Sequence, residues 1–336
     1  MARICEEEIR PARMMHDKQR CIEVDRRFLL DRRDRWVTVS CPACDGTSTE
    51  QHGEKQGFAY VQCIDCGTIY TNPRASLDLL HEFYSQSANY AYWNEHVFPA
   101  TEEARRTSIF RPRAVRLLEY CHKYGIHSGT LLEVGAAFGT FCQEVRELNL
   151  FDRIIALEPT AGLANTCRQR GLEVLECFVE DIEESELADV VAAFEVVEHL
   201  FSPRDFLTDC QRILKPGGLV VLSCPNGQGF DVAALRMLSG TFDHEHVNYF
   251  NPRSLSMLAR HCGFEVVDTQ TPGQLDAELL RKQVLEGTFD LKAQPFLHEV
   301  LVGRWDELGG AFQQFLADHQ LSSHLWLVAR KPRITG

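Results

Sequence analysis

The stretch Thr130-Leu-Leu-Glu-Val-Gly-Ala-Ala-Phe-Gly-Thr-Phe-Cys-Gln-Glu-Val145 decides the fold of this chain. An apolar, β-favouring run leads into Gly135, small residues continue to Gly139, and apolar side chains then recur at helical spacing. The pattern predicts a strand, a tight turn and a helix. Because glycine lets a backbone approach a ligand closely and the first N–H groups of a helix are free, such a turn is suited to cradling a nucleotide.

The spacing of the small residues distinguishes two kinds of nucleotide site. A dinucleotide-binding fingerprint requires Gly-x-Gly-x-x-Gly, but Ala137 and Thr140 stand where its second and third glycines belong. Glu133, two residues before the first glycine, has no role in that fingerprint. The turn resembles instead the Glu/Asp-x-Gly-x-Gly-x-Gly motif of class I S-adenosylmethionine-dependent methyltransferases, in which the acidic residue orients the loop and the methionine end of the cofactor. Ala137 departs from its middle glycine, and an ordinary strand-to-helix turn is the alternative.

Composition restricts the class of protein and its partners. With 336 residues, the chain is long enough for a doubly wound domain and a smaller module. A net charge of −13 argues against nucleic acid as a partner, since binding to its backbone needs clustered Lys and Arg. Thirteen cysteines without an N-terminal signal sequence predict a reducing, cytoplasmic location. No apolar run approaches the roughly 18 residues of a membrane span, so no membrane association is expected.

Four cysteines form a pattern typical of a metal site. The pairs Cys41-Pro-Ala-Cys44 and Cys63-Ile-Asp-Cys66 are separated by 18 residues, which matches the spacing of a zinc ribbon. With four thiolates the metal has no open position for a substrate, so the predicted Zn²⁺ is structural and folds a segment too small for its own core. The alternative is a group of four buried free thiols.

Changes in composition divide the chain into four parts. The first is rich in charges of both signs, as in a solvated helix or a partly disordered lead-in, and no chemistry is predicted for it. The predicted parts are a charged arm 1–40, a zinc-ribbon module 41–72, a helical linker and lid 73–128, and a methyltransferase-like domain 129–336 with a helical cap at about 272–320.

From Thr130 onward, strands alternate with helices, which predicts an α/β fold with a mostly parallel, doubly wound sheet covered on both faces. After 130–134, the expected strands are 153–158, 172–175, 189–194, 219–223, 262–267 and 323–329. The segments Val196-Val-Glu-His-Leu200 and Leu214-Lys-Pro-Gly-Gly218 resemble the motif after the fourth strand and the turn before the fifth in class I methyltransferases.

Further segments narrow this resemblance to one subfamily. The cysteine pairs, Asn72-Pro-Arg74 and His246-Val-Asn-Tyr-Phe250 occur in an order similar to the methyltransferase domain 23 type. The resemblance covers most of the chain. It implies seven strands in the order 3-2-1-4-5-7-6 with an antiparallel closing strand, and S-adenosyl-L-methionine as cofactor. Members of this type are often found beside surface-polysaccharide or natural-product genes, which implies a small-molecule or sugar acceptor.

The cofactor site is expected at the carboxyl ends of the strands. Glu158, 23 residues beyond Gly135, stands where a carboxylate accepts hydrogen bonds from both ribose hydroxyls. Phe178 stands where many methyltransferases have Asp, so the adenine is expected to be held by stacking and backbone. Tyr90 and Trp93 are expected as walls for the sulfonium cation, or else as core aromatics. The predicted cofactor residues are Glu133, Gly135, Ala136, Ala137, Phe138, Gly139, Glu158, Pro159, Phe178, Val179, Phe194, Glu195, Tyr90 and Trp93.

Methyl transfer is an in-line displacement, so the protein mainly positions the acceptor and removes its proton. His is the natural base near neutral pH, and His246 oriented by Glu245 is predicted to be that base. His199 is expected as a second relay or a wall of the cofactor site, and Tyr249 is predicted as a further catalytic residue. A metal site in His244-Glu-His246 is not expected, because the zinc helix motif needs histidines four residues apart. The alternative is that these residues only order a loop.

These observations predict an S-adenosylmethionine-dependent methyltransferase that methylates a small molecule or sugar, on oxygen rather than carbon. C-methylation of a nucleotide-linked sugar is the first alternative. A non-catalytic scaffold is another, but Glu133 and Glu158 would be expected to be lost in an inactive domain. An RNA methyltransferase is disfavoured by the acidity of the chain. The sequence predicts neither the identity of the acceptor nor the oligomeric state.

Overall fold

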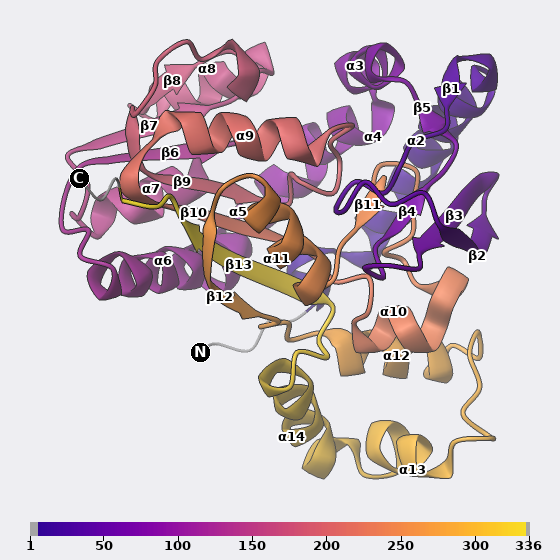
Figure 1. Cartoon of the computed structure of the whole chain (residues 1–336). Coiled ribbons are helices and arrows are strands. Elements are labelled where there is room, and N and C mark those ends of the chain that lie inside the picture. Colours follow the sequence, from indigo (N-terminus) through magenta and orange to yellow (C-terminus); the bar gives the residue numbers. More distant parts are fainter. Residues whose placement is uncertain (1–5, 334–336) are drawn as a thin grey trace.

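Seven strands form one mixed sheet in the order β12-β13-β10-β9-β6-β7-β8 (Figure 1). The computed structural model describes residues 6–333. The strands are β6 (Thr130–Val134), β7 (Arg153–Leu157), β8 (Glu173–Leu175), β9 (Ala188–Phe194), β10 (Leu214–Pro225), β12 (Glu265–Gln270) and β13 (His324–Arg330). β13 runs antiparallel to both β10 and β12, and the other neighbours pair in parallel. Numbered along the chain, this order is 3-2-1-4-5-7-6, which confirms the predicted fold class.

Apolar side chains on both faces of the central strands explain why helices cover both sides. In β9, Val191 and Ala193 face one core, whereas Val190 and Ala192 face the other. A sheet that is buried on both faces in this way needs a helical layer on each. The first core is covered by α9 and α11, which lie over the near face in Figure 1, and the second by α6 and α7. These four helices are α6 (Arg111–Lys123), α7 (Thr140–Glu147), α9 (Pro203–Ile213) and α11 (Pro252–His261), and α8 (Ala161–Gln169) packs beside β7 and β8.

The N-terminal arm packs against the rest of the chain. It contains α1 (Glu6–Ile9), α2 (Ala12–Leu30) and η1 (Arg33–Arg35), while its residues 1–5 lie outside the described part. Asp25 of α2 is buried and accepts hydrogen bonds from Ser87 Oγ (2.5 Å), Ala88 N (2.8 Å) and Asn89 N (2.9 Å). Within residues 6–35 the arm is therefore a docked helix and not a lead-in.

The ribbon strands are completed by a distant segment. β2 (Thr49–Lys55), β3 (Phe58–Cys63), β4 (Ile69–Thr71) and β11 (Asn248–Tyr249) form a four-stranded sheet, and β1 (Trp36–Val37) pairs with β5 (Arg74–Ala75). β11 pairs antiparallel with β4, and Asn251 at the start of α11 donates from Nδ2 to Cys66 O (3.1 Å). The module predicted at 41–72 is therefore continuous in structure with the segment around residue 248.

Two further groups of helices flank the sheet. The linker contains α3 (Leu77–Gln86), α4 (Ala88–Tyr92), the π-helical turn η2 (Trp93–Val97), α5 (Phe98–Arg105) and the π-helical turn η3 (Arg106–Phe110). The remaining short elements are η4 (Val179–Asp181), α10 (Phe230–Leu235) and η5 (Arg236–Leu238). Among residues 6–333, no helix has the length and apolar character needed to cross a bilayer.

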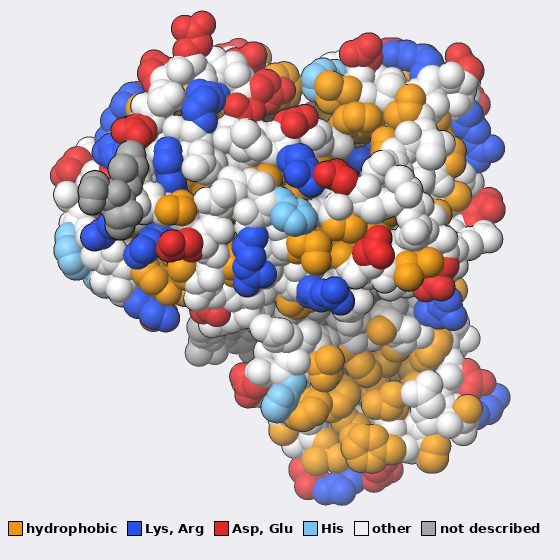
Figure 2. Space-filling model, in the orientation of Figure 1, with side chains coloured by type: hydrophobic (Ala, Val, Ile, Leu, Met, Phe, Trp, Pro, Cys, Tyr) orange, Lys and Arg blue, Asp and Glu red, His pale blue; other side chains and the backbone are white. Residues whose placement is uncertain are grey.

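The predicted cap is a helical lobe with its own core. It consists of α12 (Asp276–Leu285), α13 (Pro295–His298), the π-helical turn η6 (Glu299–Gly303) and α14 (Trp305–Asp318). Leu280 and Leu301 pack there with Leu235 of α10. Hydrophobic side chains gather on the surface of this lobe, at the bottom of Figure 2.

Candidate active site

The turn after β6 has the left-handed backbone conformation that its sequence motif requires. Gly135 (φ 71°), Ala137 (φ 48°) and Gly139 (φ 70°) all have positive φ angles. A Cβ at Gly139 would lie 2.4 Å from Leu172 Cδ1, so this position needs glycine. Ala137, the departure from the motif, still adopts the left-handed conformation, at a cost of about 1–2 kcal/mol for an L-residue. The backbone of the predicted cofactor turn is therefore retained despite the alanine.

The two acidic residues of the predicted cofactor site flank this turn. Glu158, directly after β7, is 5% exposed and accepts from Ala137 N (2.8 Å) and from Thr160 N (2.9 Å). Glu133 in β6 accepts from Cys142 Sγ in α7 (2.9 Å). Burial raises the pKa of Glu133 to about 8. Glu158 is thus the carboxylate held against the glycine turn, and Glu133 holds the helix that follows the turn.

Aromatic side chains lie beside the turn, but one of them is already paired with cations. Phe138 stacks on Phe98, with ring centroids 4.1 Å apart. Trp93 packs with this pair, and Lys18 Nζ and the Arg105 guanidinium lie 4.8 Å and 4.7 Å from its ring centroid. The predicted contact of Trp93 with a sulfonium cation therefore competes with two cations of the chain itself.

The other predicted aromatic contacts are at separate places. Tyr90 packs edge-on against Tyr84, with centroids 5.6 Å apart. Phe178, at the predicted adenine position, is 46% exposed and stacks on His81 (5.5 Å). Phe194, at the end of β9, stacks on Trp326 of β13 (5.3 Å). Phe178 is thus partly exposed beside His81, whereas Phe194 is part of the packed sheet.

Glu195 follows β9 and is held in a left-handed conformation (φ 56°). Its Oε1 accepts from Ser223 Oγ (2.6 Å) and Arg113 Nη2 (3.1 Å), and lies 3.0 Å from His324 Nε2. These contacts join β9, β10, α6 and β13 at the carboxyl edge of the sheet. Glu198 and His199 follow Glu195 by three and four residues along the chain.

Two histidines and a glutamate meet at this edge. Ligand atoms of Glu198, His199 and His246 all lie within 4.8 Å of one another. His199 Nδ1 lies 3.2 Å from Glu245 O, and His246 Nδ1 lies 3.0 Å from Thr241 O. Burial, together with the charge of His246, lowers the pKa of His199 to about 3, so this ring is neutral. The sequence prediction included His199 and His246 but not Glu198.

The predicted orientation of His246 by Glu245 is wrong. Glu245 Oε1 accepts from Asn89 Nδ2 (2.5 Å), whereas Asp243 Oδ2 lies 3.3 Å from His246 Nδ1. Adjacent residues in this loop point in different directions, so proximity in sequence misled the pairing. The partners of His246 are Asp243 and the Thr241 carbonyl.

The contacts of Tyr249 do not support a catalytic role. Tyr249 is fully buried, donates its hydroxyl proton to His246 O (2.9 Å) and accepts from Asp243 N (3.3 Å). The phenol is therefore saturated by the backbone of the 243–246 loop. Tyr249 is a positioning residue for this loop and has no access to a substrate.

Comparisons with known proteins agree with this geometry. Residues 103–269 match the profile of a family described as a methyltransferase domain. Residues 103–269 carry a methyltransferase domain. A probable S-adenosylmethionine-dependent methyltransferase of Mycolicibacterium smegmatis is 37% identical over 24% of this chain and 30% of its own length. A ubiquinone biosynthesis O-methyltransferase of Roseobacter denitrificans is 38% identical over 25% of this chain and 37% of its own.

The chain thus spans about a third of the length of these curated relatives. Among solved structures, phosphoethanolamine N-methyltransferase 2 of Haemonchus contortus, in complex with S-adenosyl-L-methionine, has a TM-score of 0.45 at 16% identity. The similarity covers 66% of this chain and 53% of that one.

The methyltransferase domain holds a second buried polar group next to the histidine pair. Asp25, His244 and Glu245 also bring ligand atoms within 4.8 Å of one another. Asp25 accepts three hydrogen bonds from the start of α4, and Glu245 accepts from Asn89. The acids of this group are therefore satisfied within the protein. No sequence motif pointed to Asp25, because this residue reaches the loop from the N-terminal arm.

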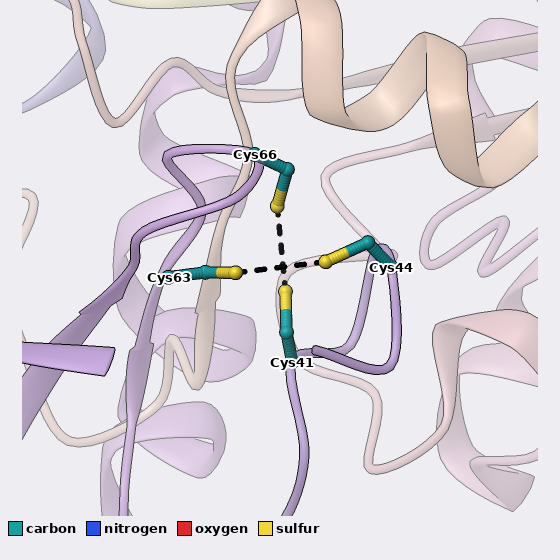
Figure 3. Close-up of side chains that lie close together, drawn as sticks. All are labelled: Cys41, Cys44, Cys63 and Cys66. Atoms are coloured by element: carbon teal, nitrogen blue, oxygen red, sulfur yellow. Dashed lines mark hydrogen bonds between the residues drawn. The ribbon is translucent and has the colours of Figure 1, made fainter. Parts of the chain in front are cut away.

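The four cysteines of the ribbon converge on one point (Figure 3). Their Sγ atoms lie within 4.8 Å of one another, with Cys41–Cys66 at 3.4 Å and Cys44–Cys63 at 3.5 Å. Cys41, Cys63 and Cys66 also belong to the core that α9 and α11 share with the sheet. The cluster is thus placed at the junction of the ribbon with the methyltransferase domain.

Proposed function

We propose that this protein transfers a methyl group from S-adenosyl-L-methionine to a hydroxyl oxygen of a small-molecule or sugar acceptor. The observation that carries the proposal is the buried Glu158 carboxylate against the left-handed Gly135–Gly139 turn, beside a pair of histidines at the same edge of the sheet. The carboxylate would bind the ribose diol of the cofactor, and a histidine would take the proton of the hydroxyl acceptor.

The residues of the turn fit the cofactor. The glycine turn would take the methionine end, Glu158 would accept from the ribose hydroxyls, and the exposed ring of Phe178 would stack on the adenine. S-Adenosylmethionine supplies an electrophilic methyl group on a sulfonium. The chain itself supplies orientation of the two reactants and a place for the acceptor proton.

The side chains expected near the acceptor favour methylation of oxygen over methylation of carbon. His246, whose ring centroid lies 4.7 Å from that of His199, is the side chain of this pair that would accept the proton of an alcohol or phenol. The names of the relatives in ubiquinone biosynthesis, which refer to O-methylation, are consistent with this choice. A role in polysaccharide or natural-product biosynthesis is part of the same proposal.

The four-cysteine cluster is proposed to hold one structural Zn²⁺. Tetrahedral coordination with Zn–S bonds of about 2.3 Å places the sulfurs about 3.8 Å apart. Four Sγ atoms within 4.8 Å of one another need only small movements to reach that geometry. All cysteines of the described residues are free, which fits a reducing compartment, and we propose the cytoplasm. A thiolate-only set leaves no coordination position for a substrate, so the zinc would serve folding.

Replacement of Glu158 tests the cofactor assignment. Glu158→Ala removes two charge-assisted hydrogen bonds to the ribose, each worth roughly 1.5–3 kcal/mol, so the affinity for S-adenosylhomocysteine should fall by a factor on the order of 100 or more. Calorimetric titration measures the dissociation constant, and Glu158→Gln keeps the shape of the side chain while removing its charge. Glu180→Ala, an exposed acid in η4, is the control.

The titration has two outcomes that contradict the proposal. Wild-type protein that does not bind S-adenosylhomocysteine would contradict the cofactor itself. Unchanged affinity in both Glu158 variants would contradict the assignment of Glu158 as the residue that binds the ribose hydroxyls. NAD⁺, which the departures from the dinucleotide fingerprint disfavour, should give no heat of binding to the wild-type protein.

A further inference from the structure

A cleft, here called the cap cleft, lies between the helical cap and the outer edge of the sheet. Its volume is about 810 Å³, within the range of about 300–1,000 Å³ that is usual for small-molecule sites. One wall is α14, with Trp305, Gly310 and Gln314, and the other contains Arg116 of α6 and Gln270 of β12. A second hollow of about 240 Å³ shares Arg116 and Gln270 and continues along α6, so an extended ligand has room.

A buried carboxylate holds the floor of the cap cleft in place. Asp276, at the start of α12, is 3% exposed and accepts from Ser322 Oγ (2.6 Å) and from Gln313 Nε2 (2.7 Å). Gln313 Nε2 also donates to the carbonyl oxygen of Gly273 (2.9 Å), which lines the cleft. These bonds fix the floor before a ligand binds, which reduces the entropy that is lost on binding.

The lining of the cap cleft matches a neutral ligand with many hydroxyl groups. A hydroxyl both donates and accepts hydrogen bonds, and so does a side-chain amide. The charged residues Arg116, Glu278 and Asp318 have both signs, so the phosphates of a nucleotide would meet no excess of positive charge. A long apolar tail would meet few apolar side chains. The amides that line the cleft are Gln270, Gln274, Gln313, Gln314 and Gln320.

Gly310, in the middle of α14, is an independent sign that a ligand approaches this helix. Glycine inside a helix is destabilising relative to alanine, so its presence needs a reason. For Gly309 the reason is packing, because a Cβ there would lie 2.4 Å from Trp305 Cε3. At Gly310, no atom of the described residues would lie within 4 Å of a Cβ, and the residue is exposed in the wall of the cleft. The bare backbone at Gly310 therefore makes room for something other than the protein itself.

The cap cleft begins close to the carboxyl edge of the sheet. Arg113 Nη2 donates to Glu195 Oε1 at this edge (3.1 Å), and Arg116 follows three residues later on α6, about 4.5 Å along the helix axis. The Arg116 guanidinium lies 5.3 Å from the ring centroid of Trp326, which stacks on the predicted cofactor residue Phe194. A ligand in the cleft is therefore next to the edge where the cofactor is expected.

We propose that the cap cleft binds the carbohydrate part of the acceptor, a neutral oligosaccharide. This inference rests on the proposed function and narrows its acceptor class from small molecules in general to glycans. An extended peptide is the main alternative, because β12 is the outer strand of the sheet and Thr269 and Gln270 line the cleft. A peptide that adds a strand needs pockets for its apolar side chains, and the amide-rich lining favours the glycan.

The experiment screens the purified protein on an array of short neutral oligosaccharides of glucose, galactose, mannose and rhamnose, with uronic-acid oligosaccharides and extended peptides on the same array. Calorimetry then measures the affinity for the neutral oligosaccharide that binds. Gly310→Gln places a side chain in the cleft and should weaken binding at least about tenfold. Gln314→Ala removes one amide and should weaken it roughly 2–10-fold.

Both variants are expected to fold. Glutamine is a better helix former than glycine, and a Cβ at Gly310 meets open space among the described residues, so Gly310→Gln should melt no lower than the wild type. Gly162→Gln is the matched control, because Gly162 is also an exposed helical glycine with open space at its Cβ position, but it lies on α8. It should bind the oligosaccharide as the wild type does.

Two results would overturn the proposal. One is an array on which only uronic-acid oligosaccharides, only peptides or no probes bind, and the other is equal affinity of wild type and Gly310→Gln for the oligosaccharide. S-Adenosylhomocysteine titrated into the same proteins separates this inference from the proposed function. If the cofactor product binds and no neutral oligosaccharide does, only the glycan site fails. If an oligosaccharide binds at the cleft and the cofactor product does not bind, the proposed function fails and the glycan site stands.

Discussion

A Cys63→Ala variant is expected to lose its structural zinc and the folded state of the ribbon. Structural zinc contributes about 10–16 kcal/mol of apparent binding free energy in zinc-finger peptides, which equals or exceeds the net stability of a typical domain. Cys63 also belongs to the core beneath α9 and α11, so the loss should lower the melting temperature of the whole protein. Elemental analysis after dialysis against a weak chelator, with a thermal melt monitored by circular dichroism, measures both effects.

Cys177→Ala is the matched control, because this half-buried thiol lies outside the cluster. It should keep the ribbon zinc and melt close to the wild type. Wild-type protein that contains no zinc when purified without chelator, or a Cys63→Ala variant that melts as the wild type does, would contradict the structural zinc.

His246→Ala is expected to lower turnover by a factor of roughly 10²–10⁴, the range found for loss of general-base assistance. In the proposed function, removal of the acceptor proton depends on this ring. The affinity for S-adenosylhomocysteine should be unchanged, since the ring is not one of the predicted contacts of the cofactor. Single-turnover formation of S-adenosylhomocysteine, with an acceptor that supports turnover, measures the chemical step.

His298→Ala, on α13, should have wild-type turnover. A His246→Ala enzyme within a few-fold of the wild type, under conditions where chemistry limits the rate, would remove His246 from the reaction.

The fold could be predicted because its signals are local. Each buried strand is a short apolar run that ends at a turn, and the Thr130–Val145 stretch combines strand, turn and helix in 16 residues. The signal for the ribbon is equally local, since each of the two Cys-x-x-Cys pairs is itself a turn. The strand order followed from resemblance, which supplies the non-local pairing that a single sequence lacks.

The parts that could not be predicted are contacts between segments far apart in the chain. β11 joins the ribbon sheet from about 180 residues away, which explains why the 41–72 module is not separate from the active-site loop. Asp25 reaches the start of α4 from an arm whose charged composition suggested solvent exposure. Within the loop, the partner of His246 is Asp243 and not its neighbour Glu245, because side-chain directions in irregular backbone do not follow from sequence order.

The positions of Ala137 and Glu198 show two limits of motif comparison. Ala137 looked like a departure from the glycine motif, yet its backbone has the left-handed conformation that the motif requires. Glu198 looked like a neighbour of His199, but the structure buries its carboxylate without a partner. Backbone conformation, burial and hydrogen bonding cannot be derived from residue type alone. The conclusions on Ala137 and Glu198 therefore required the structure.

A crystal structure with bound S-adenosylhomocysteine tests the central claim most directly. The account predicts the ribose hydroxyls on Glu158, the homocysteine portion along the Gly135–Gly139 turn, and its sulfur facing the group formed by Glu198, His199 and His246. Density for the ligand at another surface, or an adenosyl group that does not contact Glu158, would contradict the proposed methyl transfer at this site.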